Sequence, residues 1–270
     1  MPAIDPLAEP SALSRNLIDA VREAGALALD MFGRELKTWA KNGTSPVCEA
    51  DIAVDRLLRE RLAAAAPDYG WRSEESGDDP DRLAARRVWI VDPIDGTRAY
   101  IGGIPDWSIA VALVDDDRPL LGVIFAPTEQ ALFMAVAGGG ASLNGTAIRA
   151  SEGSKLEGAR VAGPRRHLEQ LAAVVPGIET VPKIHSLALR LARVAQGALD
   201  VAFAGRSSND WDLAAADLLV HEAGGALTDI GGRILTYNRA DPAHEALVAA
   251  GRSRHRALLG LVETRKREFA

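Results

Sequence analysis

Two carboxylates stand three residues apart in the stretch Asp92-Pro93-Ile94-Asp95-Gly96-Thr97, at the end of an apolar run that begins at Trp89. The run is typical of a buried β-strand, and the Pro and Gly that follow indicate a turn. Such a strand end favours chemistry, because the sheet fixes the direction of side chains that the turn exposes. Asp-Pro and Asp-Gly also form ordinary turns, so a plain hairpin is the alternative.

Further acidic residues stand at the ends of other expected elements. Asp51 begins one expected helix, Asp212 lies in the first turn of another, and Glu74 lies in an acidic loop. Each has a structural alternative, since acids commonly cap helices and acidic loops are commonly solvated. The sequence alone leaves those alternatives open for each residue taken singly.

Taken together, these acids favour a metal site. Carboxylates that converge without a cation raise one another's pKa, so their convergence implies a bound ion. Oxygen ligands without Cys or His spacing indicate Mg²⁺ rather than zinc. Such a cluster suits phosphoryl transfer, in which ions neutralise the phosphate and orient a water. A carboxylate at Asp92 could bridge two ions, and the Ile94 carbonyl could supply another ligand.

The first part of the chain reads as two helices followed by short strands. Apolar residues recur at helical spacing within 11–34, where Ser11 is an expected N-cap, and again within 51–66. Three strands follow in an expected antiparallel meander, over 108–114, 120–126 and 131–137. Gly138-Gly139-Gly140 lacks the strand–helix context of a dinucleotide site and is expected to form a bend.

Beyond residue 150 the pattern changes to alternating strands and helices. The expected strands are 160–163, 180–184, 198–203 and 245–250, and the expected helices are 167–175, 186–196, 210–223 and 253–267. We therefore expect two tightly packed subdomains. Residues 1–150 form an α+β unit whose antiparallel sheet carries most of the acids, and residues 151–270 form an α/β unit with Asp212 and the substrate contacts.

The composition is that of an ordinary globular protein. The chain has 270 residues, of which 47% are hydrophobic and 25% charged, with a net charge of −6. A negative field disfavours nucleic-acid polymers and anionic membranes as partners. The single cysteine, Cys48, suits a reducing compartment, and no signal peptide or membrane-spanning run is apparent, so we expect a cytoplasmic protein.

The order of the motifs resembles the inositol monophosphatase family. Glu74-Glu75 precedes the stretch 92–97, and Trp211-Asp212 follows it, with Ala214-Ala215-Ala216 and Glu222-Ala223-Gly224-Gly225 beyond. The resemblance covers most of the chain and disfavours the plain hairpin. It implies a layered αβαβα sandwich and a Mg²⁺-dependent, lithium-sensitive phosphomonoesterase, in a family that is often dimeric.

The resemblance also implies a role for each motif residue. Two or three Mg²⁺ ions are expected at Glu74, Asp92, Asp95, Asp212 and the Ile94 carbonyl. Water activation is expected from Thr97 and Asp51, and Glu74 completes the expected catalytic set. Substrate contacts are expected at Gly96, Thr97, Ser186, Arg206 and Asp212, with the amides of Gly96 and Thr97 receiving the phosphate.

In motif detail the chain resembles the bacterial 3′(2′),5′-bisphosphate nucleotidases more than the animal inositol enzymes. The inositol enzymes carry a Glu where this chain has Gly205, and the adjacent Arg206 suits a second phosphate better than a polyol. Cys48 departs from the Thr usual in the nucleotidase motif. Inositol 1-phosphate is the alternative substrate, with histidinol phosphate and fructose 1,6-bisphosphate less favoured. A regulatory binding protein on the same scaffold is the non-enzymatic alternative.

Overall fold

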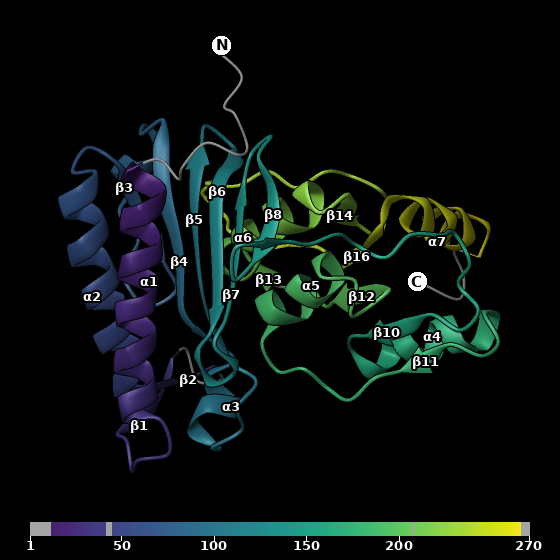
Figure 1. Cartoon of the computed structure of the whole chain (residues 1–270), viewed down its shortest axis with the longest axis horizontal. Coiled ribbons are helices and arrows are strands. Elements are labelled where there is room, and N and C mark those ends of the chain that lie inside the picture. The colour runs from purple at the N-terminus through teal and green to yellow at the C-terminus, as the bar shows by residue number, and fades with distance from the viewer. Residues whose placement is uncertain (1–11, 42–44, 207, 266–270) are drawn as a thin grey trace.

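Five layers of helix and sheet stack side by side in the computed structural model, which describes residues 12–41, 45–206 and 208–265 (Figure 1). A helix pair covers the outer face of a seven-stranded sheet, a second pair separates it from a five-stranded sheet, and a third pair closes the far side. The pairs are α1 (Ala12–Met31) with α2 (Glu49–Ala65), α5 (Leu187–Ala195) with α6 (Asp210–Glu222), and α4 (Arg165–Val174) with α7 (Arg252–Thr264). The predicted αβαβα sandwich is confirmed.

The large sheet follows the order of the chain. Its strands are β3 (Gly70–Ser73), β4 (Arg87–Asp95), β5 (Ser108–Asp115), β6 (Arg118–Ala126), β7 (Ala131–Val136), β8 (Gly140–Leu143) and β9 (Thr146–Ala147). All neighbours are antiparallel except β3 and β4, so the predicted meander is confirmed. The glycine bend leads into β8, where the Glu222 carboxylate accepts hydrogen bonds of 2.8 Å from the amides of Gly138 and Gly140.

The smaller sheet is mixed. Its order is β11 (Glu179–Thr180), β10 (Arg160–Ala162), β12 (Val201–Ala204), β16 (Leu247–Gly251) and β14 (Gly225–Asp229). The predicted strand over 180–184 is wrong, because pairing ends at Thr180 and Pro182 cannot donate to a ladder. Sequence patterning also missed β14, which begins at Gly225, the second glycine of the pair that follows α6.

Short elements complete the described chain. β1 (Thr38–Lys41) pairs with β2 (Ser45–Cys48), and β13 (Ser208–Asn209) pairs with β15 (Ala243–His244). α3 (Thr97–Ile101) follows β4, and two 3₁₀ turns lie at Pro80–Leu83 and Pro127–Glu129. The predicted N-cap Ser11 and the end of the predicted helix 253–267 lie outside the described residues, and the division of the chain near residue 150 stays a prediction.

Side-chain alternation in β5 explains how the layers pack. Ile109, Val111 and Leu113 join the core under α1 and α2, whereas Ala110 and Ala112 join the core under α6. A Cβ at Gly122 on β6 would lie 3.0 Å from the backbone oxygen of Ala215. Small residues on both sides therefore let α6 approach the sheet closely, and this approach brings the first turn of α6 to the end of β4.

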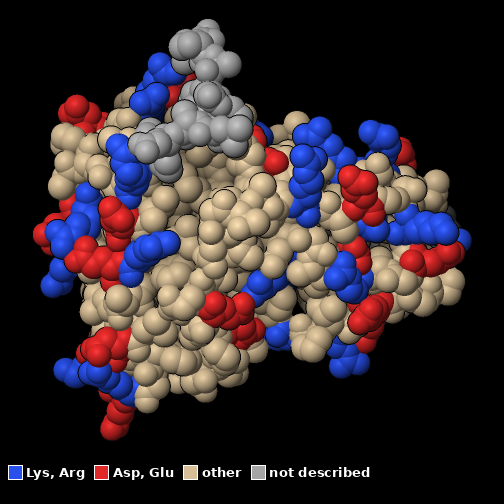
Figure 2. Space-filling model, viewed as in Figure 1, with Lys and Arg blue, Asp and Glu red and all other residues tan. Residues whose placement is uncertain are grey.

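The surface carries both signs of charge. On the face that Figure 2 shows, the blue and red side chains of the described residues are interspersed around a broad uncharged area. Within the described ranges, no helix is long and apolar enough to cross a membrane.

Candidate active site

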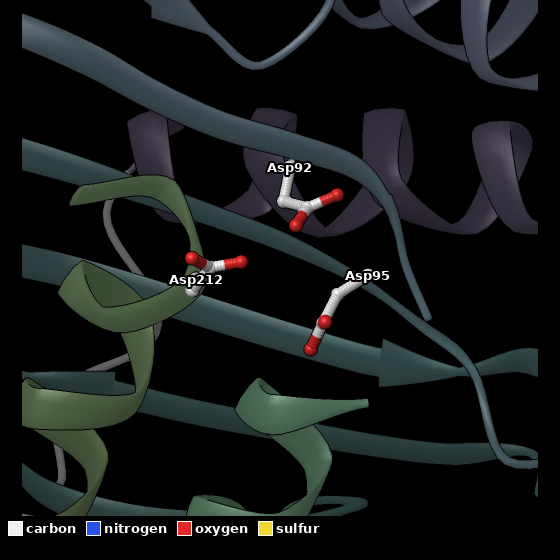
Figure 3. A group of neighbouring side chains, drawn as sticks. All are labelled: Asp92, Asp95 and Asp212. Carbon is white, nitrogen blue, oxygen red and sulfur yellow. The ribbon is translucent and has the colours of Figure 1, made fainter. Parts of the chain in front are cut away.

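Three carboxylates meet between the large sheet and α6. Asp92 and Asp95 come from β4 and Asp212 from the first turn of α6, and one oxygen of each lies within 4.8 Å of the others (Figure 3). Asp92 and Asp95 are buried, with 1% and 6% of their surface exposed. The structure thus brings together three of the four predicted metal-binding carboxylates in one cluster.

A bulge in β4 makes this convergence possible. Residues three apart on a regular strand point to opposite faces of the sheet. The pairing of β4 with β5 shifts register between Asp92 and Asp95, and such a bulge re-aims side chains. Asp92 and Asp95 therefore reach the α6 side together, while Ile94 packs in the core under α1 and α2. β4 continues to Asp95, which agrees with the prediction that both carboxylates lie where the strand ends.

Glu74 lies beside this cluster, just beyond the end of the neighbouring strand β3. Ser73 on β3 pairs with Val91 on β4 in parallel register, so Glu74, the next residue, lies beside Asp92 on β4. The amide of Glu74 donates to the carbonyl of Val91 at 3.1 Å. The loop that follows is held by Asp55 of α2, whose carboxylate accepts hydrogen bonds from the hydroxyls of Ser73 (2.5 Å) and Ser76 (2.6 Å).

Asp51 and Thr97 form a hydrogen-bonded pair beside the cluster. Thr97 Oγ1 lies 3.1 Å from Asp51 Oδ1 and 3.0 Å from the Ile94 carbonyl. Asp51 is the third residue of α2, and its Oδ2 accepts hydrogen bonds of 2.8 Å from both the amide and the thiol of Cys48. Asp51 therefore takes part in the cap of its helix, which is the structural role that the sequence left open. Its second oxygen faces Thr97.

Asp95 is held from the α5 side. Its Oδ2 accepts hydrogen bonds of 2.6 Å from the hydroxyl of Ser186 and the amide of Ala188. Ser186 is the N-cap of α5, and its hydroxyl also accepts from the amide of Leu189 at 2.9 Å. Ser186 is fully buried, and its predicted contact with substrate stays a prediction.

The carboxylates raise one another's pKa. Burial, followed by the charges of Glu74, Asp95 and Asp212, raises the pKa of Asp92 well above its usual value. Burial and the charge of Asp95 raise the pKa of Asp212 to about 7, and burial and the charge of Asp212 raise that of Glu74 to about 8. Burial also raises the pKa of Asp51. Without a cation this cluster therefore disfavours full ionisation.

One buried oxygen in the cluster has no hydrogen-bond partner among the described residues. Asp92 Oδ1 is buried without a hydrogen bond, a state that normally costs free energy. A hard cation among the three aspartates would satisfy this oxygen and offset the like charges. The donor set is composed of oxygen atoms, which is the set that Mg²⁺ prefers. The residues present therefore fit Mg²⁺.

The structure places the predicted substrate contacts Gly96 and Arg206 differently. Gly96 follows β4 with a φ of 97°, a left-handed conformation that favours glycine, and α3 begins immediately after it. Arg206 is largely exposed and forms an ion pair of 3.2 Å with Glu245. The structure gives Arg206 no contact with the three aspartates, and its predicted role stays a prediction.

Some supporting residues escaped sequence reasoning. Cys48 and Asn209 are the N-caps of α2 and α6, and each donates its amide to an acid three residues later, Asp51 or Asp212. That spacing is the capping-box signal and could have been read from the sequence. Asp55 and Ser108, which lies 2.9 Å from the Ser186 hydroxyl, carry no comparable local signal, because their partners come from distant segments.

Comparison with known proteins agrees with this geometry. The model of the inositol monophosphatase family matches residues 9–267. An inositol-1-monophosphatase of Rhizobium meliloti is 35% identical over 233 residues, covering 82% of this chain and 87% of that protein. The 3′(2′),5′-bisphosphate nucleotidase CysQ of Aggregatibacter actinomycetemcomitans is 30% identical over 243 residues, covering 84% and 88%.

Solved structures show the same fold. The extragenic suppressor protein suhB of Bartonella henselae superposes with a TM-score of 0.81 at 28% identity, covering 94% of this chain and 100% of that one. The family match spans nearly the whole chain, and the predicted fold is the fold observed. The chain belongs to the inositol monophosphatase family, whose members are phosphatases that hydrolyse phosphomonoesters.

Proposed function

We propose that this phosphatase is Mg²⁺-dependent and hydrolyses a small phosphomonoester by direct attack of water, with no covalent intermediate. The observation that carries the proposal is the buried, unpartnered Asp92 Oδ1 among carboxylates of raised pKa. Asp92, Asp95, Asp212, Glu74 and the Ile94 carbonyl would hold two or three ions. Bound Mg²⁺ supplies positive charge that neutralises the phosphate and acidifies water.

The protein's own residues position the reacting groups. Thr97 Oγ1 can donate to Asp51 Oδ1 while one of its lone pairs accepts a hydrogen bond from the attacking water. Cys48 fixes the other oxygen of Asp51 and thereby keeps Oδ1 directed at Thr97. The amides of Gly96 and Thr97 receive the phosphate at the turn into α3. Ser186 and Ala188 hold Asp95 in place.

For the substrate, we propose a 3′-phosphonucleotide such as 3′-phosphoadenosine 5′-phosphate. Gly205 and Arg206 support this preference, as does the 30% identity to a bisphosphate nucleotidase. Arg206 is paired with the exposed Glu245, so a second phosphate would compete with this carboxylate for the guanidinium. Inositol 1-phosphate is the second candidate, because a curated inositol-1-monophosphatase is 35% identical.

Phosphate release from a panel of substrates tests both the proposed Mg²⁺-dependent reaction and the proposed substrate. The panel contains 3′-phosphoadenosine 5′-phosphate, inositol 1-phosphate, histidinol phosphate and fructose 1,6-bisphosphate, each with Mg²⁺ and with EDTA. We expect Mg²⁺-dependent release and a preference for the nucleotide, which Arg206→Ala should reduce. Preference for inositol phosphate would refute the nucleotide assignment. No release from any of the four would favour the regulatory alternative.

The composition supports a proposal for the cellular compartment in which this enzyme acts. The buried, free thiol of Cys48 and the negative net charge support a cytoplasmic enzyme that acts on small molecules rather than on nucleic acid or membranes. We propose a homodimer, following the family resemblance. Sedimentation equilibrium at micromolar protein concentration checks the assembly state.

A further inference from the structure

His185 and Asp106 form a close pair beside the active site. The Nδ1 atom of His185 lies 2.8 Å from one carboxylate oxygen of Asp106 and 3.0 Å from the other, and its backbone amide donates to the first at 2.7 Å. Both side chains are partly exposed, at 26% for His185 and 22% for Asp106. Two hydrogen bonds from one residue to one carboxylate fix the ring, and Nε2 is the ring nitrogen that faces away from Asp106.

The pair is attached directly to the residues of the site. The amide of Ser186 donates to the backbone oxygen of Asp106 at 3.2 Å, and the Ser186 hydroxyl holds Asp95 at 2.6 Å. A Cβ on Gly96 would lie 3.3 Å from the Ser186 amide and 3.4 Å from the Asp106 oxygen. His185 therefore adjoins the turn where the phosphate is expected to bind.

A cavity opens beside Ile184, the residue that precedes His185 in the chain. It measures about 690 Å³, within the usual range for small-molecule sites, and lies between α4 and residues 180–184. Ile184 and Arg190 form part of its wall, and Arg190 donates to the Ile184 carbonyl at 2.9 Å. Burial lowers the pKa of the Arg190 guanidinium, and the negative charges of Asp95 and Asp106 act against this effect. Arg190 thus connects the cavity wall electrostatically with Asp95 of the carboxylate cluster, and His185 lies in the chain between Ile184 of the wall and Ser186 of the site.

We propose that His185 contacts a hydroxyl group of the substrate's organic part through Nε2, that this part extends toward the cavity, and that Asp106 positions the ring. The proposal rests on the phosphatase function proposed above. His185 is then a specificity-determining residue and Asp106 a positioning residue. The sugar of a 3′-phosphonucleotide and the ring of inositol 1-phosphate both carry a suitable hydroxyl. The contact therefore does not depend on which of these two compounds is the substrate.

Two isosteric variants separate the two ring nitrogens. In His185→Asn the amide nitrogen replaces Nδ1 and keeps the bond to Asp106, but nothing replaces Nε2. In His185→Gln the side-chain amide reaches the place of Nε2 instead. His221→Asn is the control for replacing a partly exposed histidine that is paired with an aspartate, because His221 Nε2 lies 3.0 Å from Asp217 Oδ1 with 28% of the histidine side chain exposed. His221 is nine residues after Asp212 on α6, about 14 Å along the helix axis.

The assay compares a hydroxylated substrate with 4-nitrophenyl phosphate, which carries no hydroxyl. For His185→Asn we expect at least a tenfold loss of kcat/KM on the preferred substrate of the panel and less than a threefold change on 4-nitrophenyl phosphate. His185→Gln should lose less, and Asp106→Asn should raise KM on the hydroxylated substrate only. His221→Asn should match wild type.

Three outcomes would overturn the proposal. Equal losses on both substrates, with a lowered Tm, would show a structural role for His185. Activity of His185→Asn and His185→Gln equal to that of His221→Asn would show no role, while wild-type phosphate release would leave the phosphatase function intact. A wild-type protein that releases phosphate from no substrate would refute the proposed function and this inference with it.

Discussion

Replacing Asp92 by Asn should abolish activity and at the same time stabilise the metal-free protein. The substitution keeps the shape of the side chain but removes a negative charge that lies within 4.8 Å of two other carboxylates. Two unit charges at this distance repel by roughly 3.5 kcal/mol at an effective dielectric constant of ~20. Because protonation already relieves part of this repulsion in the wild type, we expect a gain of about 2–4 kcal/mol at pH 8.

The pH dependence of this gain follows from the raised pKa values. A carboxyl whose pKa is higher in the folded than in the unfolded protein lowers the free energy of unfolding at high pH. It has no such effect below its unfolded pKa, about 4. With folded pKa values of about 7 for Asp212 and about 8 for Glu74, the free energy of unfolding of the metal-free wild type should fall between about pH 4 and pH 8. The advantage of Asp92→Asn should therefore shrink as the pH is lowered from 8 to 5.

Urea denaturation in EDTA, followed by tryptophan fluorescence, measures this difference at pH 5 and pH 8. Phosphate release with Mg²⁺ measures activity, which should fall at least a hundredfold in the variant. Adding Mg²⁺ should raise the stability of the wild type far more than that of Asp92→Asn, because the variant has lost a metal-binding charge. Wild-type activity in the variant, or no gain in its metal-free stability at pH 8, would refute the electrostatic reasoning.

Three further substitutions or conditions test individual contacts. Cys48→Ala removes the thiol that donates to Asp51, so kcat should fall about fivefold, the equivalent of about 1 kcal/mol. Cys48→Ser should retain the hydrogen bond and most of the activity. Steady-state kinetics of the two variants test this expectation. Ser186→Ala removes both the cap of α5 and a donor to Asp95, so urea unfolding should show a loss of about 1–2 kcal/mol, and an unchanged stability would contradict the contacts. Millimolar LiCl should inhibit phosphate release by competing for a Mg²⁺ position; full activity in lithium with KCl as the control would set this enzyme apart from the behaviour expected of its family.

The helices, strands and acidic motifs of this chain could be predicted from the sequence, because each of them depends on residues that are close together in the chain. Alternating apolar residues indicate the strands of the large sheet, helical spacing indicates α1 and α2, and Pro and Gly mark where elements end. Acids at several element ends already indicated a hard metal, since like charges converge only around a cation. The family resemblance then connected these acids to phosphate-ester hydrolysis.

Tertiary structure alone decided how the acids meet. The side-chain period of a regular strand would send Asp92 and Asp95 to opposite faces, and only the bulge against β5 turns both toward α6. The close approach of α6 depends on Gly122 and Ala215, which are far apart in the sequence. The pairing of His185 with Asp106 likewise joins residues 79 positions apart. Local sequence patterns cannot specify such contacts, because the contacts form only when distant segments pack together. A register shift between strands, or an interface between two segments, produces no periodic pattern in the sequence.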